Sequence, residues 1–272
     1  MKLGMLAAQA AGRVADLLMP RQCAACDRPI EYEAGDLCVE CWRDLATVVG
    51  GPCCRTCGDD RVEYLLKDRQ CTRCRLKQHG LRFHGFARVG RYDAALKSLV
   101  LRFKHRVVLD RLLGRLLADA VRGQFDPGEV DMWVPVPAHW RRRLAVGYQP
   151  THLLSRAAAA AWHGRVEPAL VAGRYVPPFH LQPGLSSHAR TQAIRGAFRA
   201  AKGYRLEGKT VCVVDDVTTT GATLAEARRA LIKGGVARLF AAVVAKVSPD
   251  PPGTEGLDLR QLPDYTPETP AE

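Results

Sequence analysis

The sequence predicts an α/β protein with a parallel sheet and flanking helices, preceded by a small cysteine-rich module. Two apolar runs of strand length, residues 210–214 and 239–247, flank a helix-like segment, 222–233, that stops at two glycines. A strand, a helix and a strand in this order place the two strands parallel in one sheet. The module follows from a second observation, that nine of the ten cysteines lie between Cys23 and Cys74.

Composition divides the chain of 272 residues into four regions. They are an amphipathic N-terminal helix over 1–22, a cysteine-rich module over 23–80, an α/β domain over 81–247 and a disordered, acidic, Pro-rich tail over 248–272. Apolar residues at helical spacing predict the first helix, and the charged residues between them argue against a signal peptide. No uncharged apolar run reaches about 18 residues, so we expect no membrane span and a cytoplasmic protein.

Further elements are predicted inside the α/β region. Leu and Val at helical spacing predict helices over 92–105 and 108–121, and an Ala- and Leu-rich stretch predicts a third over 151–162. The short apolar run 132–136 is closed by prolines, which is typical of a strand that ends in a tight loop. These elements extend the predicted α/β pattern back toward the cysteine-rich module.

The formal net charge of +12 describes a basic protein. A basic body suits a polyanionic ligand, either pyrophosphate or nucleic acid, but a merely soluble basic surface accounts for the charge equally well. Two other classes are disfavoured more directly, because the chain has no G-x-x-x-x-G-K-[ST] string and no strand-linked G-x-G-x-x-G. NTPase and dinucleotide-binding functions therefore have little support.

Eight of the cysteines form four Cys-x2-Cys pairs, which predict metal sites. The pairs are Cys23 with Cys26, Cys38 with Cys41, Cys54 with Cys57, and Cys71 with Cys74. A two-residue gap lets a tight turn direct two thiolates at one metal, and two such turns complete a tetrahedral site. We expect two structural Zn²⁺ ions with no open coordination position. The spacing leaves open whether the pairs combine sequentially or cross-braced.

Disulfide bonding and redox chemistry fit the cysteine pairs less well than zinc does. A disulfide framework needs an oxidising compartment, and a redox Cys-x-x-Cys would account for one pair and not for the remaining three. Of the remaining cysteines, Cys53 is expected to be a spare or alternative ligand beside Cys54. Cys212 lies inside a predicted buried strand and is expected to be a small core residue.

A candidate sugar-phosphate site follows the run 210–214. Its string is Asp215-Asp216-Val217-Thr218-Thr219-Thr220-Gly221-Ala222-Thr223. Free N–H groups at the start of the next helix and the threonine hydroxyls favour a phosphate, while Gly221 allows the backbone to approach closely. Carboxylates are poor partners for phosphate but good acceptors for sugar hydroxyls. The string therefore predicts a ribose 5-phosphate site, although paired aspartates can also cap a helix or bind Mg²⁺ without a sugar.

At these residues the chain resembles a type I phosphoribosyltransferase, and its zinc knuckles make it similar to the ComF/GntX family of competence-type proteins. The resemblance covers nearly everything up to Val247. It implies a type I phosphoribosyltransferase-like fold behind a double zinc ribbon. The ligand it implies is 5-phosphoribosyl-1-pyrophosphate (PRPP) or another ribose phosphate, with Mg²⁺ carried in by the diphosphate. It also implies a role in natural transformation or in the use of external DNA, with single-stranded DNA and DNA-uptake or recombination proteins as partners.

The resemblance also implies roles for individual residues. Asp215 and Asp216 would contact the ribose hydroxyls and act as the catalytic carboxylates. The residues implied to bind PRPP are Thr218, Thr219, Thr220, Gly221, Ala222 and Thr223 at the 5-phosphate, and Val136, Pro137, Arg141, Arg142 and Arg143 in a stretch similar to the family's pyrophosphate loop. Gln182 and Arg190 lie in a stretch that resembles the mobile loop of such sites. A helix ending at Lys104 matches a further family pattern, or is an ordinary basic helix end.

The chain departs from the family pattern on the side of the second substrate. The family usually continues its pyrophosphate loop with an Arg-Gly-Phe-Asn-Gln type of string, where this chain has Val146-Gly147-Tyr148-Gln149-Pro150. Three hypotheses therefore remain. The chain is a ribose-phosphate-binding protein of DNA uptake, an active transferase that joins the phosphoribosyl group to an unidentified nitrogen acceptor, or a zinc-dependent nucleic-acid-binding adaptor without catalysis.

Overall fold

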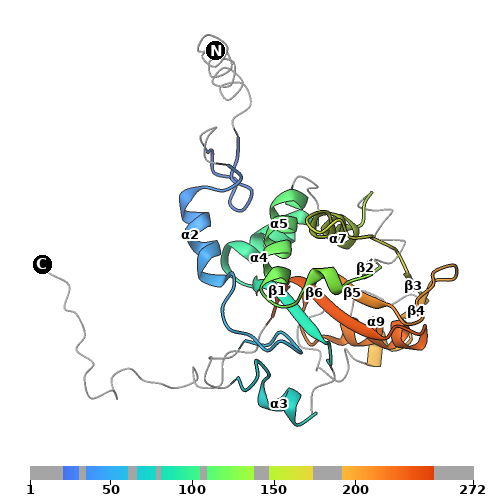
Figure 1. Ribbon diagram of the computed structural model, residues 1–272. Helices are drawn as coiled ribbons and strands as arrows, with labels where there is room; N and C mark the ends of the chain where they lie inside the picture. The colour runs from blue at the N-terminus through green and yellow to red at the C-terminus, as the bar shows by residue number, and fades with distance from the viewer. Residues whose placement is uncertain are drawn as a thin grey trace, which may run out of the picture.

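A parallel sheet of four strands forms the centre of the molecule (Figure 1). The computed structural model describes residues 21–30, 35–60, 66–77, 81–104, 109–137, 147–173 and 192–247. The sheet has the order β1-β6-β5-β2, and all three neighbouring pairs are parallel, as the sequence predicts. Its strands are β1 (Gly85–Arg91), β2 (Met132–Pro135), β5 (Thr210–Thr218) and β6 (Arg238–Lys246). Two short strands, β3 (Leu170–Ala172) and β4 (Phe198–Ala200), form a separate antiparallel pair.

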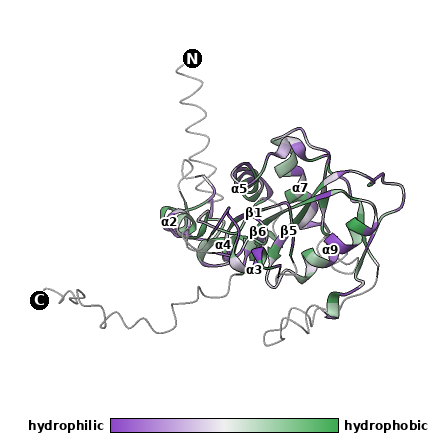
Figure 2. Cartoon of the chain, turned by 60° about the horizontal axis from the view of Figure 1, so that its bottom comes forward, coloured by the Kyte–Doolittle hydropathy of each residue, from purple (hydrophilic) through white to green (hydrophobic). Residues whose placement is uncertain are grey.

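Helices cover both faces of this sheet (Figure 1). The helices of the α/β region are α4 (Ala94–Phe103), α5 (Asp110–Arg122), α7 (Pro150–Ala160) and α9 (Ala222–Lys233), and a 3₁₀ turn, η4, spans Pro127–Glu129. The buried side chains of α4, α5 and α7 join one apolar cluster, and those of α9 join a second. Figure 2 shows hydrophobic residues along the central strands between these two layers. The predicted layered α/β architecture is therefore confirmed.

Most of the elements expected from the sequence are present with small shifts at their ends. The helix expected over 222–233 has the bounds of α9, and the helices expected over 92–105, 108–121 and 151–162 are α4, α5 and α7. One boundary was wrong in a way that matters. The strand expected to end at residue 214 continues to Thr218, because β5 keeps its pairing with β6 as far as Lys246.

Several predicted segments lie outside the described residues. These are residues 1–20 of the predicted N-terminal helix and the whole of the predicted acidic tail, 248–272. Among the helices that the structure describes, none combines the length and apolar character that crossing a bilayer requires.

The cysteine-rich region packs against β1, the edge strand of the sheet, from both of its faces. We call the described residues between 21 and 50 ribbon 1 and those between 51 and 77 ribbon 2; they contain the helices α2 (Val39–Val48) and α3 (Thr72–Arg75). Ribbon 1 shares a cluster with Ala87 and Val89, and ribbon 2 shares the other cluster with Phe86. Because side chains alternate along a strand, the ribbons lie on opposite faces of β1.

Close contacts fix each ribbon on this strand. At the end of ribbon 1, the backbone N–H of Gly50 donates to the carbonyl oxygen of Val89 at 2.7 Å, so the chain there covers the open edge of β1. On the ribbon 2 side, Gly58 lies against the ring of Phe86, and a Cβ atom at Gly58 would be only 2.4 Å from that ring. The buried guanidinium of Arg88 pairs with Asp60 of ribbon 2. The ribbons and the sheet therefore form one packed unit.

We predict that Gly58→Ala destabilises the fold by about 1–3 kcal/mol more than Gly51→Ala, because only the first change forces a methyl group against Phe86. Gly51 has open space around the equivalent position. Both glycines have a positive φ, 73° and 78°, so the backbone strain is common to the two variants. Urea unfolding measures the difference. Equal stabilities would contradict the packing of ribbon 2 on β1.

Candidate metal centres and phosphate loop

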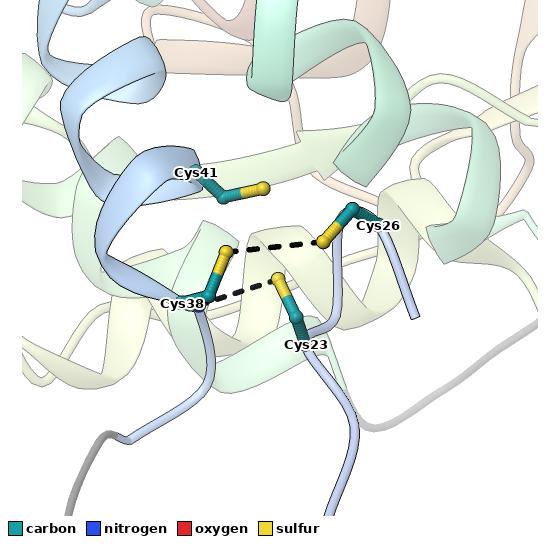
Figure 3. A group of neighbouring side chains, drawn as sticks. All are labelled: Cys23, Cys26, Cys38 and Cys41. Carbon is teal, nitrogen blue, oxygen red and sulfur yellow. Dashed lines mark hydrogen bonds between the residues drawn. The ribbon is translucent and has the colours of Figure 1, made fainter. Parts of the chain in front are cut away.

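The eight paired cysteines converge into two groups of four. The first group is Cys23, Cys26, Cys38 and Cys41, and the second is Cys54, Cys57, Cys71 and Cys74. Within each group the four sulfur atoms lie within 4.8 Å of one another. Figure 3 shows the four side chains of the first group pointing toward a common centre. The pairs therefore combine sequentially along the chain and not cross-braced, which the spacing alone left open.

The two groups repeat the same local geometry. In ribbon 1 the N–H of Cys38 donates to the sulfur of Cys23 at 3.3 Å, and in ribbon 2 the N–H of Cys71 donates to the sulfur of Cys54 at the same distance. Each first pair also sits in a turn that a residue with positive φ closes, Asp27 or Gly58. Hydrogen bonds to sulfur favour the thiolate form that binds a metal.

The donor set fits Zn²⁺ and does not fit disulfides. Four thiols around one point form the soft, tetrahedral set that structural zinc prefers. All ten cysteines are free, and the sulfur atoms of Cys26 and Cys38 are 3.8 Å apart, far beyond a disulfide bond of about 2.05 Å. The chain thus has two four-cysteine sites that fit zinc.

The two remaining cysteines stay outside these groups. Cys53 is buried next to Cys54, but its sulfur faces Gln124, whose side-chain nitrogen lies at 3.7 Å. It is not among the four thiols that converge in ribbon 2. Cys212 is fully buried in β5, as expected for a core residue, and this burial raises the pKa of its thiol.

The carboxyl ends of the four parallel strands bring the predicted phosphate loop to one edge of the sheet. Asp215 and Asp216 lie within β5 and not after it, and the loop to α9 begins only at Thr219. Gly221 has a φ of 79° at the N-terminus of α9, and a Cβ atom there would be 2.2 Å from the Leu81 side chain. Only glycine fits this turn. The turn aims the first N–H groups of α9 at the loop.

The two aspartates have different surroundings. Burial raises the pKa of Asp215 well above its ordinary value, and the negative charge of Asp216 adds to this effect. Asp216 is half-buried, and its carboxylate lies 3.9 Å from the ammonium group of Lys104, which caps the end of α4. Lys104 is therefore part of the acidic site, whether it reflects the family pattern or is an ordinary basic helix end.

Tyr92 is a member of this site that the sequence analysis missed. It directly follows β1, so it lies at the same edge of the sheet as Asp216. Burial, and then the negative charge of Asp216, raise the pKa of its phenol. Its position after a strand end was the available signal, but β1 contains two glycines and two arginines and was not predicted as a strand.

The predicted pyrophosphate loop is described only at its start. The N–H of Val136 donates to the carbonyl oxygen of Val214 at 2.9 Å, which places Val136 and Pro137 beside β5. The Thr151 hydroxyl donates to the carbonyl oxygen of Val136 at 2.7 Å. Arg141, Arg142 and Arg143, and the predicted mobile-loop residues Gln182 and Arg190, lie outside the described residues.

Known proteins similar to this chain carry names from DNA uptake and DNA use. A model of the double zinc ribbon domain matches residues 14–75. Competence protein F of Haemophilus influenzae is 30% identical over 221 residues, which cover 79% of this chain and 92% of that protein. DNA utilization protein YhgH of Salmonella typhimurium is 30% identical over 226 residues, 81% of this chain and 95% of its own length. The YhgH of Escherichia coli is 28% identical with similar coverage.

Two solved structures show a weaker likeness. The allosteric regulatory enzyme of purine biosynthesis aligns with 49% of this chain at 25% identity and a TM-score of 0.34. Glutamine PRPP amidotransferase from B. subtilis aligns with 48% of this chain at 27% identity and a TM-score of 0.32. In both cases the alignment covers 25% of the other chain.

We predict that Cys54→Ser and Cys53→Ser differ in metal content although the two residues are neighbours. Cys54 is one of four converging thiols, so its loss should lower the zinc content from about two ions per chain to about one. Cys53→Ser should keep both ions, because its sulfur faces Gln124. Elemental analysis of the purified variants measures the content. Metal loss in Cys53→Ser, or retention of both ions in Cys54→Ser, would overturn the assignment.

We also predict that Asp215→Asn stabilises the fold at neutral pH. A folded-state pKa raised by burial means that the stability Asp215 contributes is present at low pH and is lost as the pH rises through that pKa. An asparagine oxygen can still accept from the N–H of residue 216, as Asp215 does at 2.9 Å. Thermal unfolding at pH 7.5 should show a higher Tm, with each kcal/mol worth roughly 2–4 °C.

Asp131 provides the control of opposite sign. The N–H of Thr210, and then Lys209, lower the pKa of Asp131, so its contribution is present above the ordinary pKa and is lost as the pH falls. Asp131→Asn should therefore lower the Tm at pH 7.5. A lower Tm for Asp215→Asn as well would show that the buried carboxyl group is not a cost to the fold.

Proposed function

The chain belongs to the family of competence protein F and DNA utilization protein YhgH, and on that premise we propose that it binds a ribose 5-phosphate at the loop between β5 and α9 and serves DNA uptake or the use of external DNA. PRPP is the ligand that suits this loop best. Single-stranded DNA and proteins of DNA uptake or recombination are its proposed partners. The role in DNA uptake is proposed from the family, and the ligand is proposed from the residues of the loop.

The order of groups along one loop carries the proposal. Asp215 and Asp216 come first, on β5, and offer carboxylate oxygens that accept hydrogen bonds from sugar hydroxyls. The N-terminus of α9 follows, where unpaired N–H groups and the helix dipole favour a phosphate. A ribose 5-phosphate presents hydroxyls at one end and a dianion at the other. Its two ends match the two halves of the loop.

The threonines between these halves supply further donors. Thr219 is exposed, and Thr220 and Thr223 are half-buried, so their hydroxyls are accessible to a ligand above the loop. Thr218 is buried and ends the strand, so its contribution would come from the backbone. With a diphosphate, Mg²⁺ would neutralise part of the ligand's charge, and carboxylate oxygens such as those of Asp216 are ligands that it accepts.

Transfer of the phosphoribosyl group is the second candidate, and the buried acid pair favours it. In such a transfer the bond from C1 of the ribose to the pyrophosphate oxygen breaks, a bond from C1 to a nitrogen forms, and pyrophosphate leaves. Positive charge develops on the sugar ring, and a carboxylate held in a protected position stabilises it strongly. Asp215, 6% exposed, and the neighbouring Asp216 are the groups for this role.

We predict that the wild-type protein binds PRPP and ribose 5-phosphate in the presence of Mg²⁺, and that the double change Asp215→Asn with Asp216→Asn weakens binding at least about tenfold, or about 1.4 kcal/mol. The reason is the loss of two carboxyl groups that accept hydrogen bonds from sugar hydroxyls. Isothermal titration calorimetry measures both affinities. Asp131→Asn is the matched control, because Asp131 accepts from Thr210 at the opposite end of β5.

Three results would decide between the hypotheses. Unchanged affinity in the double variant would refute the site. Pyrophosphate release in the presence of a panel of nitrogenous bases would establish transfer, and binding without release would establish a binding protein. For the biological role, the gene should restore transformation to a Haemophilus influenzae strain that lacks competence protein F, and the double variant should not.

A further inference from the structure

Lys246, the last residue of β6, is a buried charge between ribbon 2 and the phosphate loop. Its side chain is 3% exposed. Its ammonium group lies 3.0 Å from a carboxylate oxygen of Asp59 and 3.4 Å from the backbone carbonyl oxygen of Thr219. Removing an ammonium group from water is unfavourable unless partners replace the water. The two acceptors therefore fix the position of the ammonium group, and it in turn fixes them.

Asp59 is part of the metal-binding turn of ribbon 2. Its backbone carbonyl accepts from the N–H of Cys54 at 3.0 Å, and the N–H of Gly58 donates to the carbonyl of Cys54 at 2.7 Å. Both bonds close the turn that directs Cys54 and Cys57 at the metal. The fold of this turn around its thiols therefore sets the position of the Asp59 carboxylate.

A second, apolar connection joins the same two parts of the molecule. Leu81, which is 1% exposed, packs against Gly221 at the start of α9. Two residues further along, the N–H of Phe83 donates at 3.3 Å to the carbonyl of Thr56, between two metal ligands. The segment after ribbon 2 is also tied to α9, because Arg228 donates to the carbonyl of Arg82 at 2.8 Å.

We propose that Lys246 is a positioning residue through which the metal site of ribbon 2 holds the phosphate loop in its binding shape. The ammonium group anchors the loop at Thr219, and Leu81 supports it at Gly221. A loop that is already ordered loses less entropy when it binds, so this anchoring raises the affinity for a ligand. Only the ligand in this inference rests on the proposed function. The positioning of the loop does not.

Lys246→Met is the test, and Arg88→Met is its matched control. Arg88 is also a buried cation on the sheet that pairs with an aspartate of ribbon 2, the adjacent Asp60. Arg88 lies on β1, and its partners are Asp60 of ribbon 2 and the backbone carbonyl of Gly50 in ribbon 1, neither of which belongs to the phosphate loop. Each change removes one buried cation from beside one aspartate. The two variants therefore differ in whether the loop loses its anchor.

Hydrogen exchange of the zinc-loaded protein without ligand gives the first readout. In Lys246→Met, the amides of residues 218–223 should exchange about tenfold faster or more, while elemental analysis still finds both zinc ions. In Arg88→Met, exchange in this loop should stay at the wild-type rate. Ribose 5-phosphate, titrated with Mg²⁺, should bind several-fold more weakly to Lys246→Met than to Arg88→Met.

Each contrary result has a distinct meaning. Unchanged loop exchange in Lys246→Met, or equal loosening in Arg88→Met, overturns the inference, because the lysine would then support the fold in general. If the wild-type protein does not bind ribose 5-phosphate, the proposed function fails, and hydrogen exchange alone decides the positioning role. If Lys246→Met does not fold, Asp59→Asn decides it by the same measurements, because asparagine keeps the volume of the side chain and removes its charge.

Discussion

The packing of two cysteine-rich ribbons on opposite faces of β1 is the constraint on which the rest of the structure depends. A ribbon of this size cannot bury a core of its own, and an edge strand is exposed along one side. The ribbons cover the edge strand, and the sheet supplies the core against which the ribbons pack. Ribbon 1 joins the apolar cluster of α4, α5 and α7, and ribbon 2 joins that of α9. The boundary at residues 80 and 81, clear in composition, does not separate two cores.

The parts of the fold and site that sequence could predict are those that short spacing encodes. Two-residue gaps identify all eight cysteines that converge into the two groups, and apolar spacing identifies α9 with its bounds. The grouping of the pairs, the extension of β5 and the partners of Asp216 depend on contacts that no local motif encodes, such as the one between Lys104 and Asp216. Tyr92 and Lys246 carry no local motif. They are recognisable only once parallel pairing has brought four strand ends to one edge.

The carboxyl ends of the parallel strands also bring two neighbouring aspartates into different surroundings. Asp215 is buried, and its burial and the negative charge of Asp216 raise the pKa of its carboxyl group well above the ordinary value. A strongly shifted pKa beside a second carboxyl group is typical of a functional site. Sequence analysis found it through its motif, and the structure supplies the reason why it is chemically distinct from its neighbour.

The charged residues described at the carboxyl ends of the strands do not offer enough positive charge to neutralise a diphosphate. Lys104 faces Asp216, and Lys246 faces Asp59, so each of these two lysines already lies beside a carboxylate. A diphosphate would bring several more negative charges. The N-terminus of α9 offers only about half a positive charge. We propose that Mg²⁺ and the cationic side chains of Arg141, Arg142 and Arg143, which follow Pro137 in the sequence, supply the remainder. This charge balance supports the proposal that those arginines serve the pyrophosphate end of the site.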